Sequence, residues 1–158
     1  MALPMEMFTE SEYAALEAKA NYRSEFINGQ ISAMAGGIST HAALCLAVGS
    51  AIRAKLKNRC MAYGSDLRIR VRATALQTYP DVSVVCGPCQ YWGKHTDCVE
   101  NPVVLVEVLS RGTAAYDRGA KFAHYKLIES LREYVLVWQS RRGSMSTAAA
   151  TAASGTRT

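Results

Sequence analysis

The spacing of hydrophobic residues predicts one long helix in the first half of the chain. Leu44, Val48, Ile52 and Leu56 recur every four residues, so a helix over about 40–57 would carry them on one face. These side chains form the stripe that the helix is expected to turn toward the core.

Other stretches carry the patterns of β-strands. Residues 66–72 alternate strictly between polar and apolar, which predicts a strand with one apolar face and one arginine face. Residues 81–85, 103–109 and 133–138 are nearly continuous apolar runs, which are typical of strands buried in a domain.

Local signals complete the expected order of elements. Thr9 and Glu12 have the spacing of a capping box, which predicts a short helix over about 10–18. The pair Asn28-Gly29 lies between two short strands and is the strongest short-range signal for a hairpin. With a further helix over about 115–128, the pattern predicts an α/β domain with a mixed central sheet flanked by helices.

Composition divides the chain at residue 139. Residues 1–139 are expected to form one domain, whereas residues 140–158 contain almost only small residues and arginines and are expected to be a disordered tail. No stretch has the roughly 18 consecutive apolar residues of a membrane span, and the first residues lack the pattern of a secretory signal.

Charge and cysteine content indicate the kind of partner and the cellular compartment of the protein. The formal net charge is +5, which favours anionic partners to a mild degree. The 5 cysteines are an odd number, which fits a reducing cytoplasm better than a disulfide framework. We therefore expect a cytoplasmic protein.

Two carboxylates lie within the apolar strands. Asp81 follows Pro80 at the start of one strand, and Glu107 lies inside the next. A carboxylate in such a place is costly to bury unless it is paired, protonated or bound to a metal. Asp81 alone could be a turn residue, and Glu107 could form a buried ion pair with an arginine. Together they indicate a site for Mg²⁺ or Mn²⁺ with an activated water.

A lysine follows on the next helix. Asp117, Lys121 and Tyr125 are spaced i, i+4 and i+8 and therefore share one helix face. Taken alone, Asp117 and Lys121 would be a surface ion pair. Beside two metal-binding carboxylates, the lysine could instead orient a water or stabilise developing charge.

The order of these motifs resembles the Uma-two family of restriction-type endonucleases, within the PD-(D/E)XK nuclease superfamily. The resemblance extends over about residues 8–138. The segments that carry it are residues 25–31, 64–68, 79–85, 101–110 and 116–125.

The resemblance implies a restriction-endonuclease-like fold and a role for each site residue. Asp81 and Glu107 would bind the metal, and Glu25 would support them as a further acidic residue. The superfamily places its lysine two residues after the glutamate, where this chain has Leu109, so Lys121 would take over that role from the next helix. The implied substrate is DNA. Homodimerisation is a further expectation, because nucleases that cut both strands often act in pairs.

Arginines would supply the contacts to DNA. Arg68 and Arg70 project from the arginine face of the strand over 66–72, where they are expected to contact phosphates. The alternative is that this face is simply solvated. The pattern does not specify contacts to bases.

A second metal hypothesis comes from the loop between the two carboxylate strands. Cys86, Cys89, His95 and Cys98 have the residue types of a Cys₃His zinc site. A variable loop with incidental cysteines is the simpler interpretation. His41, at the start of the long helix, is interpreted as structural.

These observations favour a Mg²⁺-dependent endonuclease that hydrolyses phosphodiester bonds in DNA. Two other classes stay open: a catalytically inactive nucleic-acid-binding module and a zinc-stabilised interaction protein. DNA binding without cleavage would select the binding module, and stoichiometric zinc that resists dialysis would favour the zinc-stabilised protein.

Overall fold

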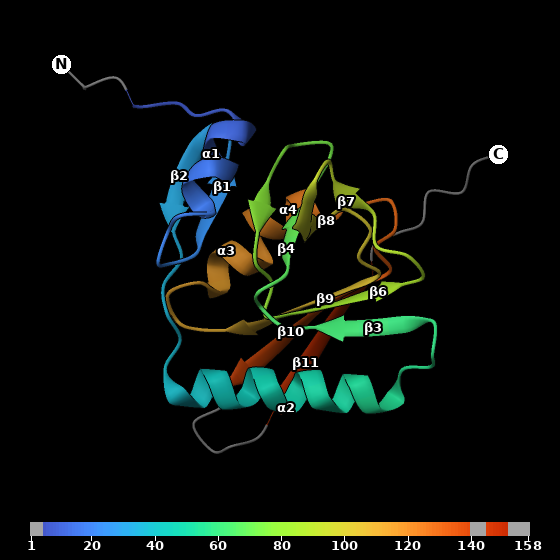
Figure 1. The fold of residues 1–158 in the computed structure, drawn as a ribbon. Coiled ribbons are helices and arrows are strands. Elements are labelled where there is room, and N and C mark those ends of the chain that lie inside the picture. Colours follow the sequence, from blue (N-terminus) through green and yellow to red (C-terminus); the bar gives the residue numbers. More distant parts are fainter. Residues whose placement is uncertain (1–4, 140–144, 152–158) are drawn as a thin grey trace.

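The computed structural model describes residues 5–139 and 145–151, which form two mixed β-sheets and four helices (Figure 1). The first sheet has the strand order β2-β1-β5-β4-β8-β7 and the second has the order β11-β10-β9-β6-β3. This arrangement confirms the predicted α/β class. The predicted single central sheet is replaced by two sheets.

The elements follow in chain order, and the first half of the chain ends at β5. These are α1 Glu10–Glu17, β1 Ser24–Ile27, β2 Gln30–Ala33, α2 Ser39–Lys55, β3 Cys60–Tyr63, β4 Arg68–Arg70 and β5 Gln77–Thr78. The second half contains β6 Val82–Cys86, β7 Tyr91–Trp92, β8 His95–Val99, β9 Val104–Leu109, α3 Ala114–Arg118, α4 Ala120–Tyr125, β10 Glu133–Gln139 and β11 Met145–Thr151.

The predicted capping box and the predicted hairpin are both confirmed. Thr9 caps α1 through the backbone N–H of Glu12, and the Glu12 carboxylate accepts in return from the Thr9 N–H. The turn between β1 and β2 has positive φ at both Asn28 and Gly29, the backbone that a two-residue hairpin requires.

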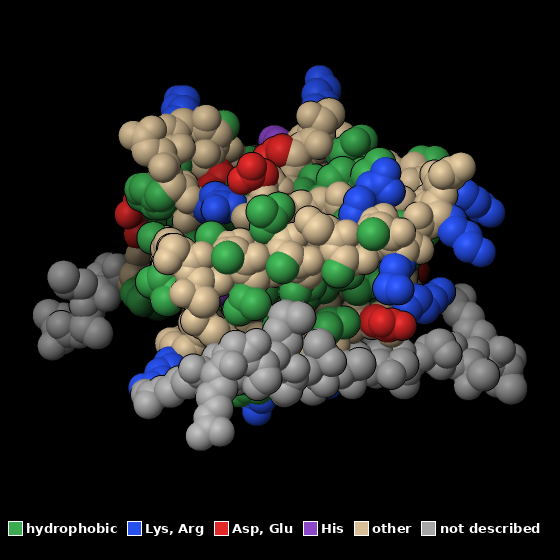
Figure 2. Space-filling view, turned by 90° about the horizontal axis from the view of Figure 1, so that it is seen from below, with side chains coloured by type: hydrophobic (Ala, Val, Ile, Leu, Met, Phe, Trp, Pro, Cys, Tyr) green, Lys and Arg blue, Asp and Glu red, His purple; other side chains and the backbone are tan. Residues whose placement is uncertain are grey.

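Sheet β11-β10-β9-β6-β3 is covered on one face by α2 (Figure 1). Leu44, Val48 and Ile52 pack against a cluster of buried valines on that face, so three residues of the predicted stripe form the contact between helix and sheet. Leu56, the fourth, lies just beyond the end of α2. These valines are Val82, Val106, Val108 and Val137. Seen from the α2 side, Lys and Arg side chains lie both at the end of the molecule where α2 ends and, more scattered, over the rest of this face (Figure 2).

The opposite face of this sheet contacts the main hydrophobic core. Leu105 and Leu109 of β9 belong to that core, together with Tyr125 of α4 and Ile69 of β4. Since alternate residues of a strand point to opposite faces, Glu107 must lie on the same side as Leu105 and Leu109. The carboxylate of Glu107 is thereby turned away from α2 and toward α4.

The chain crosses from one sheet to the other at Pro80. Strand β5 ends at Thr78 in the first sheet, and β6 begins at Val82 in the second. Proline has no backbone N–H to donate to a ladder, so the pairing of β5 cannot continue through it. Asp81 therefore lies at the junction of the two sheets.

The helix predicted over 115–128 is divided into α3 and α4. Gly119 between them has φ −106° and ψ −96°, which is outside the helical region. The two short helices still bring Asp117 and Lys121 together, with 3.5 Å between the carboxylate and the amine.

The expectation of a disordered tail is corrected in part. Residues 145–151 form β11, which pairs antiparallel with all of β10. Small side chains do not prevent such pairing, because ladder hydrogen bonds use only the backbone. The rest of the predicted tail, residues 140–144 and 152–158, lies outside the described residues, and the domain boundary at 139 stays a prediction. Within the ranges described, no helix is both long and apolar enough to cross a membrane.

Candidate active site

A cleft of about 1010 Å³ brings together the carboxylates and the lysine singled out in the sequence. Its lining comes from both sheets, the start of α2, and helices α3 and α4. The ionisable residues in the lining are Glu25, His41, Asp81, Glu107, Arg111, Tyr79, Tyr116, Asp117 and Lys121.

Glu107 is a deeply buried carboxylate of the cleft, with 4% of its surface exposed. The amine of Lys121 lies 2.7 Å from Glu107 Oε1, and the Tyr125 hydroxyl donates to the same oxygen at 2.9 Å. Burial raises the pKa of Glu107 to about 7, although the positive charge of Lys121 opposes the shift. The group is thus poised between its two protonation states near neutral pH.

Asp81 is anchored to the strand that carries Glu107. Its Oδ2 accepts a hydrogen bond of 2.7 Å from the backbone N–H of Val108, the residue after Glu107. The side chain of Asp81 remains 17% exposed. This bond holds Asp81 beside Glu107 while leaving it in contact with the cleft.

Lys121 is almost completely buried between two carboxylates. Burial alone would lower its pKa, but the negative charges of Glu107 and Asp117 outweigh that effect and keep the pKa above its usual range. Lys121 is therefore a fixed positive charge. The expectation that its amine reaches a site carboxylate is confirmed by the 2.7 Å contact with Glu107.

Glu25 enters the cleft from the first sheet. Its carboxylate accepts hydrogen bonds from the hydroxyls of Thr78 and Tyr116, the first at 2.6 Å. Tyr116 belongs to α3, one residue before Asp117, so Glu25 links β1 to the helix pair that carries Lys121. Glu25, Asp81, Glu107 and Lys121 thus line one cleft.

The donor set fits a hard divalent cation. In the described part of the chain, the hydrogen bonds to Glu107 all go to Oε1 and the backbone bond to Asp81 goes to Oδ2. One oxygen of each carboxylate is therefore held by the protein, and the other is left for an ion. Carboxylate oxygens are the ligands that Mg²⁺ and Mn²⁺ prefer.

His41 and Cys45 complete the surroundings of Asp81, which the sequence did not indicate. His41 Nε2 lies 3.5 Å from Asp81 Oδ2 and 3.1 Å from the Val108 carbonyl oxygen. Cys45 Sγ lies 3.5 Å from His41 Nδ1. Burial raises the pKa of the Cys45 thiol to about 12, and the charge of Asp81 adds to the shift. The i, i+4 spacing of His41 and Cys45 was visible in the sequence, but their contact with Asp81 was not.

The prediction that Arg68 faces DNA is corrected by its burial. Arg68 is 1% exposed, because its guanidinium packs 5.3 Å from the ring centre of Tyr13 in α1 and lies 3.2 Å from Asp97. A residue covered in this way cannot contact a phosphate without opening the fold.

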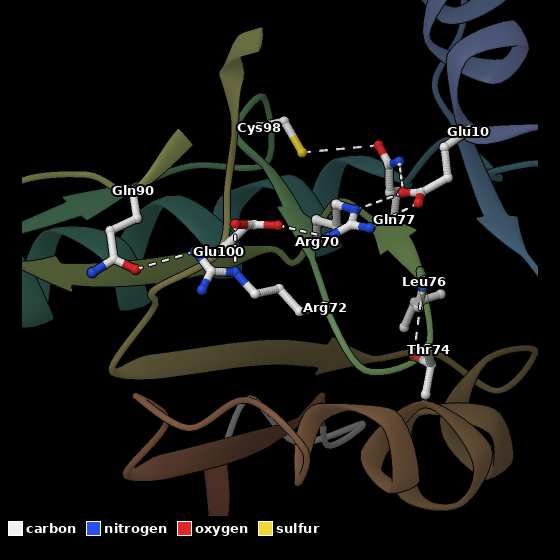
Figure 3. A network of polar contacts seen from close by, with 9 residues as sticks. All are labelled: Glu10, Arg70, Arg72, Thr74, Leu76, Gln77, Gln90, Cys98 and Glu100. Carbon is white, nitrogen blue, oxygen red and sulfur yellow. Dashed lines mark hydrogen bonds and ion pairs between the residues drawn. The ribbon is translucent and has the colours of Figure 1, made fainter. Parts of the chain in front are cut away.

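Arg70 is likewise occupied within the protein (Figure 3). It pairs with Glu10 at 2.6 Å and with Glu100 at 2.7 Å. Arg68 and Arg70 are thus paired with acidic residues in α1 and in the segment 97–100, whereas Arg72, beyond the end of β4, keeps 65% of its side chain exposed. Strict alternation predicted a strand over 66–72, of which residues 68–70 form β4, but it could not show that α1 would cover Arg68 and Arg70.

The Cys₃His zinc hypothesis is also not supported by the geometry. Cys86 forms a disulfide with Cys60, its cross-strand neighbour in β3, and Cys98 is buried against Gln77. His95 stacks on Trp92. Over residues 5–139, the one grouping of at least three possible metal ligands is His41, Cys45 and Asp81. The disulfide also departs from the expectation that the cysteines are all reduced.

Comparison with known proteins settles the family. Residues 10–145 match the family model of Uma2, described as "Putative restriction endonuclease". The chain belongs to the Uma2 family. The resemblance seen in the motifs is thereby confirmed over most of the chain.

Curated relatives of this Uma2 protein occur in Synechocystis sp. (strain ATCC 27184 / PCC 6803 / Kazusa). The protein slr1290 is 36% identical over 135 residues, which are 85% of this chain and 70% of that protein. The protein sll1609 is 31% identical over 134 residues, which are 84% of this chain and 76% of that protein.

A solved structure shares the fold. It is described as a "putative nuclease belonging to DUF820 from Anabaena variabilis", and it superposes with a TM-score of 0.66 at 18% identity. The superposition covers 87% of this chain and 82% of that one. It confirms the nuclease-like fold class of this Uma2 protein.

Proposed function

We propose that this Uma2 protein is a divalent-metal-dependent endonuclease that hydrolyses phosphodiester bonds in DNA. The observation that carries the proposal is the 2.7 Å contact between Lys121 and Glu107 in the cleft that also holds Asp81. Two carboxylates and a lysine supply the metal ligands and the fixed positive charge that phosphodiester hydrolysis requires. Membership of a family of restriction-type endonucleases supports the same reaction class.

Asp81 and Glu107 would hold Mg²⁺ or Mn²⁺ through their free oxygens. Such an ion, when bound, polarises the phosphate and lowers the pKa of its water. The protein contributes the positions of the ligands: Val108 N–H holds Asp81, while Lys121 and Tyr125 hold Glu107. The carboxylates are therefore oriented before any ion arrives, which reduces the cost of ordering them.

Lys121 has a hydrogen-bonding capacity beyond its carboxylate partners. An ammonium group has three N–H donors, and the nearest described partners of Lys121 are Glu107 at 2.7 Å and Asp117 at 3.5 Å. We assign the remaining donor to the attacking water or to a phosphate oxygen. Because Lys121 is charged and buried, this contact acts in a region of low dielectric, where it is stronger than in water.

Glu25 supports the site through Tyr116. The bond from the Tyr116 hydroxyl holds α3 against β1, and the bond from the Thr78 hydroxyl holds β5 against β1. We assign Glu25 to positioning, with a smaller effect on cleavage than Asp81 or Glu107.

Arg111 takes over the role first given to Arg68 and Arg70. It is an exposed arginine in the lining of the cleft, two residues after the end of the strand that carries Glu107. Replacing Arg111 with Ala should weaken DNA binding and reduce the dependence of log affinity on log salt by about one phosphate contact.

This replacement has a matched control just before β10. Arg132 is also exposed but does not line the cleft, so Arg132→Ala should leave the salt dependence unchanged. Fluorescence anisotropy with labelled duplex at several salt concentrations measures both variants. Equal slopes for Arg111→Ala and the unmodified protein would remove Arg111 from the DNA contact.

Metal affinity should depend on pH through Glu107. Its pKa of about 7 means that a proton occupies the carboxylate below neutral pH, and an ion must displace that proton to bind. The affinity for Mn²⁺ should therefore increase with pH, by up to about tenfold per unit, until it levels off above about pH 7–8. Titration calorimetry at a series of pH values measures the affinity for Mn²⁺. An affinity that is independent of pH would show that Glu107 is not a ligand.

Nicking of supercoiled plasmid tests the proposed activity. Protein freed of metal with a chelator should convert the plasmid to open circles only after Mg²⁺ or Mn²⁺ is restored. Linear product formed directly from supercoiled plasmid would favour a homodimer that cuts both strands. Plasmid that is bound but not cut under every metal condition would select the alternative, a catalytically inactive nucleic-acid-binding module.

A further inference from the structure

A second group of metal ligands meets at Asp81. His41 and Cys45 lie one turn apart on α2, and Asp81 approaches them from the junction of the sheets. One ligand atom from each residue can be chosen so that all three lie within 4.8 Å of one another. None of the three is fully buried, so an ion can reach them from the cleft that His41 and Asp81 line.

The spacing of these atoms suits a small tetrahedral ion. Zinc bonds to sulfur, nitrogen and carboxylate oxygen are short, and a tetrahedral site built from them places neighbouring ligand atoms about 3.4–3.6 Å apart. His41 Nε2 lies 3.5 Å from Asp81 Oδ2 and 4.0 Å from Cys45 Sγ. These two distances are close to those of a tetrahedral site, and an ion bound there would replace the 3.1 Å contact of His41 Nε2 with the Val108 carbonyl oxygen.

The chemistry of this group differs from that of the nuclease site. Thiolate and imidazole ligands select zinc, cobalt and related ions over Mg²⁺, which prefers oxygen. Asp81 and Glu107 offer only oxygen, whereas His41 and Cys45 add nitrogen and sulfur. Asp81 therefore belongs to two groups of ligands, one suited to Mg²⁺ and the other suited to zinc-class ions.

We propose that His41, Cys45 and Asp81 form a zinc-class metal site whose occupation inhibits the nuclease. On binding, the thiol proton of Cys45 passes to solvent as the sulfur–metal bond forms, and water completes the coordination. A zinc-class ion on Asp81 Oδ2 would place a second positive charge beside the free oxygen that Asp81 offers to Mg²⁺, and this repulsion would weaken the binding of Mg²⁺. The inhibitory consequence rests on the proposed function, but the metal site itself does not.

Cobalt provides a direct readout of the site without any need for activity. A thiolate bound to Co²⁺ gives a charge-transfer absorption in the near ultraviolet, and zinc should displace the cobalt and abolish that band. The unmodified protein, assayed without thiol reductant to keep the Cys60–Cys86 disulfide intact, should develop the band with one equivalent of Co²⁺. Cys45→Ser and Cys45→Ala should both lose it.

Two further variants locate the site. Cys89 is a partly buried free cysteine far from this group in the sequence, so Cys89→Ser should keep the band. Glu107→Gln should keep it as well, because Glu107 is not one of the three ligands. A band that survives in both Cys45 variants, or no band in the unmodified protein, would overturn the proposal. Circular dichroism melting of each Cys45 variant distinguishes lost ligation from lost folding, and an unfolded Cys45→Ser leaves Cys45→Ala to decide.

The inhibitory effect is measured on plasmid nicking in Mg²⁺. Cys45 does not line the cleft, so Cys45→Ser should nick at the same rate as the unmodified protein when zinc is absent. Its inhibition by zinc should require at least about ten times more metal, since loss of one ligand weakens binding by at least that factor. Equal zinc sensitivity of the two proteins would contradict the inhibitory role. Failure of both to nick would refute the proposed function alone, because the cobalt band still reports the metal site.

Discussion

Replacing Asp81 with Asn, or Glu107 with Gln, is expected to reduce metal-dependent DNA cleavage by about a thousandfold or more. Each change removes one negative charge that the cation needs, at almost constant side-chain volume, and a loss of this size is typical when the electrostatic stabilisation of a transition state is removed. The fold should survive. The amide oxygen introduced by Asp81→Asn can still accept from Val108 N–H, and in Glu107→Gln the amine of Lys121 still has Asp117 within 3.5 Å.

A matched exposed carboxylate serves as the control for this pair. Asp66 contacts Arg23 at the surface, at a distance of 3.3 Å, and its side chain is fully exposed. Asp66→Asn should therefore cleave DNA like the unmodified protein. Cleavage near the normal rate by either Asp81→Asn or Glu107→Gln, in protein free of contaminating nuclease, would refute the assignment of metal ligands.

The second large effect concerns Lys121. Replacing it with Met keeps most of the apolar stem but removes the charge that compensates Glu107 and Asp117, both of which are buried. Breaking one partner of a buried ion pair typically costs about 3–5 kcal/mol. We expect a loss of stability of that order at pH above neutral, and loss of cleavage as well. Chemical denaturation followed by circular dichroism measures the loss of stability.

The pH dependence of this loss identifies its cause. Burial holds the folded-state pKa of Glu107 above its ordinary value, and Lys121 opposes that shift, so removing Lys121 must raise the pKa further. A carboxyl group with a raised folded-state pKa binds more protons in the folded state, so its contribution to stability falls as pH rises above about 4.5 and through the folded pKa. Lys121→Met should thus be most unstable at alkaline pH and recover toward about pH 5.

An exposed lysine directly after the same helix pair provides the comparison. Lys126 is exposed and lies over the Phe122 ring, with 5.2 Å from its amine to the ring centre. Lys126→Met should change stability by less than about 1 kcal/mol. A loss of stability in Lys121→Met as small as in Lys126→Met, and unchanged by pH, would show that the amine of Lys121 does not compensate the buried carboxylates.

The sequence predicted the parts of this fold that depend on local physics. The capping box at Thr9, the turn at Asn28 and Gly29, and the stripe on α2 all follow from short-range rules, and each is present in the structure. Short strands such as β5 and β7 have two residues each and carry no pattern long enough to read. The division into two sheets also depends on pairings between distant segments.

The individual residues of the candidate site could be predicted, but their arrangement could not. Asp81 and Glu107 stood out because charge in an apolar strand is expensive, and the helix spacing together with the family resemblance singled out Lys121. Their shared cleft is what the structure adds. Arg70 lies on a polar strand face, and such a face predicts a contact with something polar but does not specify whether that is water, DNA or Glu10. The contact of His41 with Asp81 could not be predicted because it depends on how α2 packs against the junction of the sheets.

We expect Asp81 and Glu107 together to hold one divalent cation. Calorimetric titration of Mn²⁺ into metal-free protein at about pH 8, with Cys45→Ser as the background to silence the neighbouring ligand group, tests it most directly. We predict one bound ion per chain, with affinity at least about tenfold weaker in both Asp81→Asn and Glu107→Gln. Binding of Mn²⁺ with unchanged affinity and stoichiometry in either variant would contradict the account.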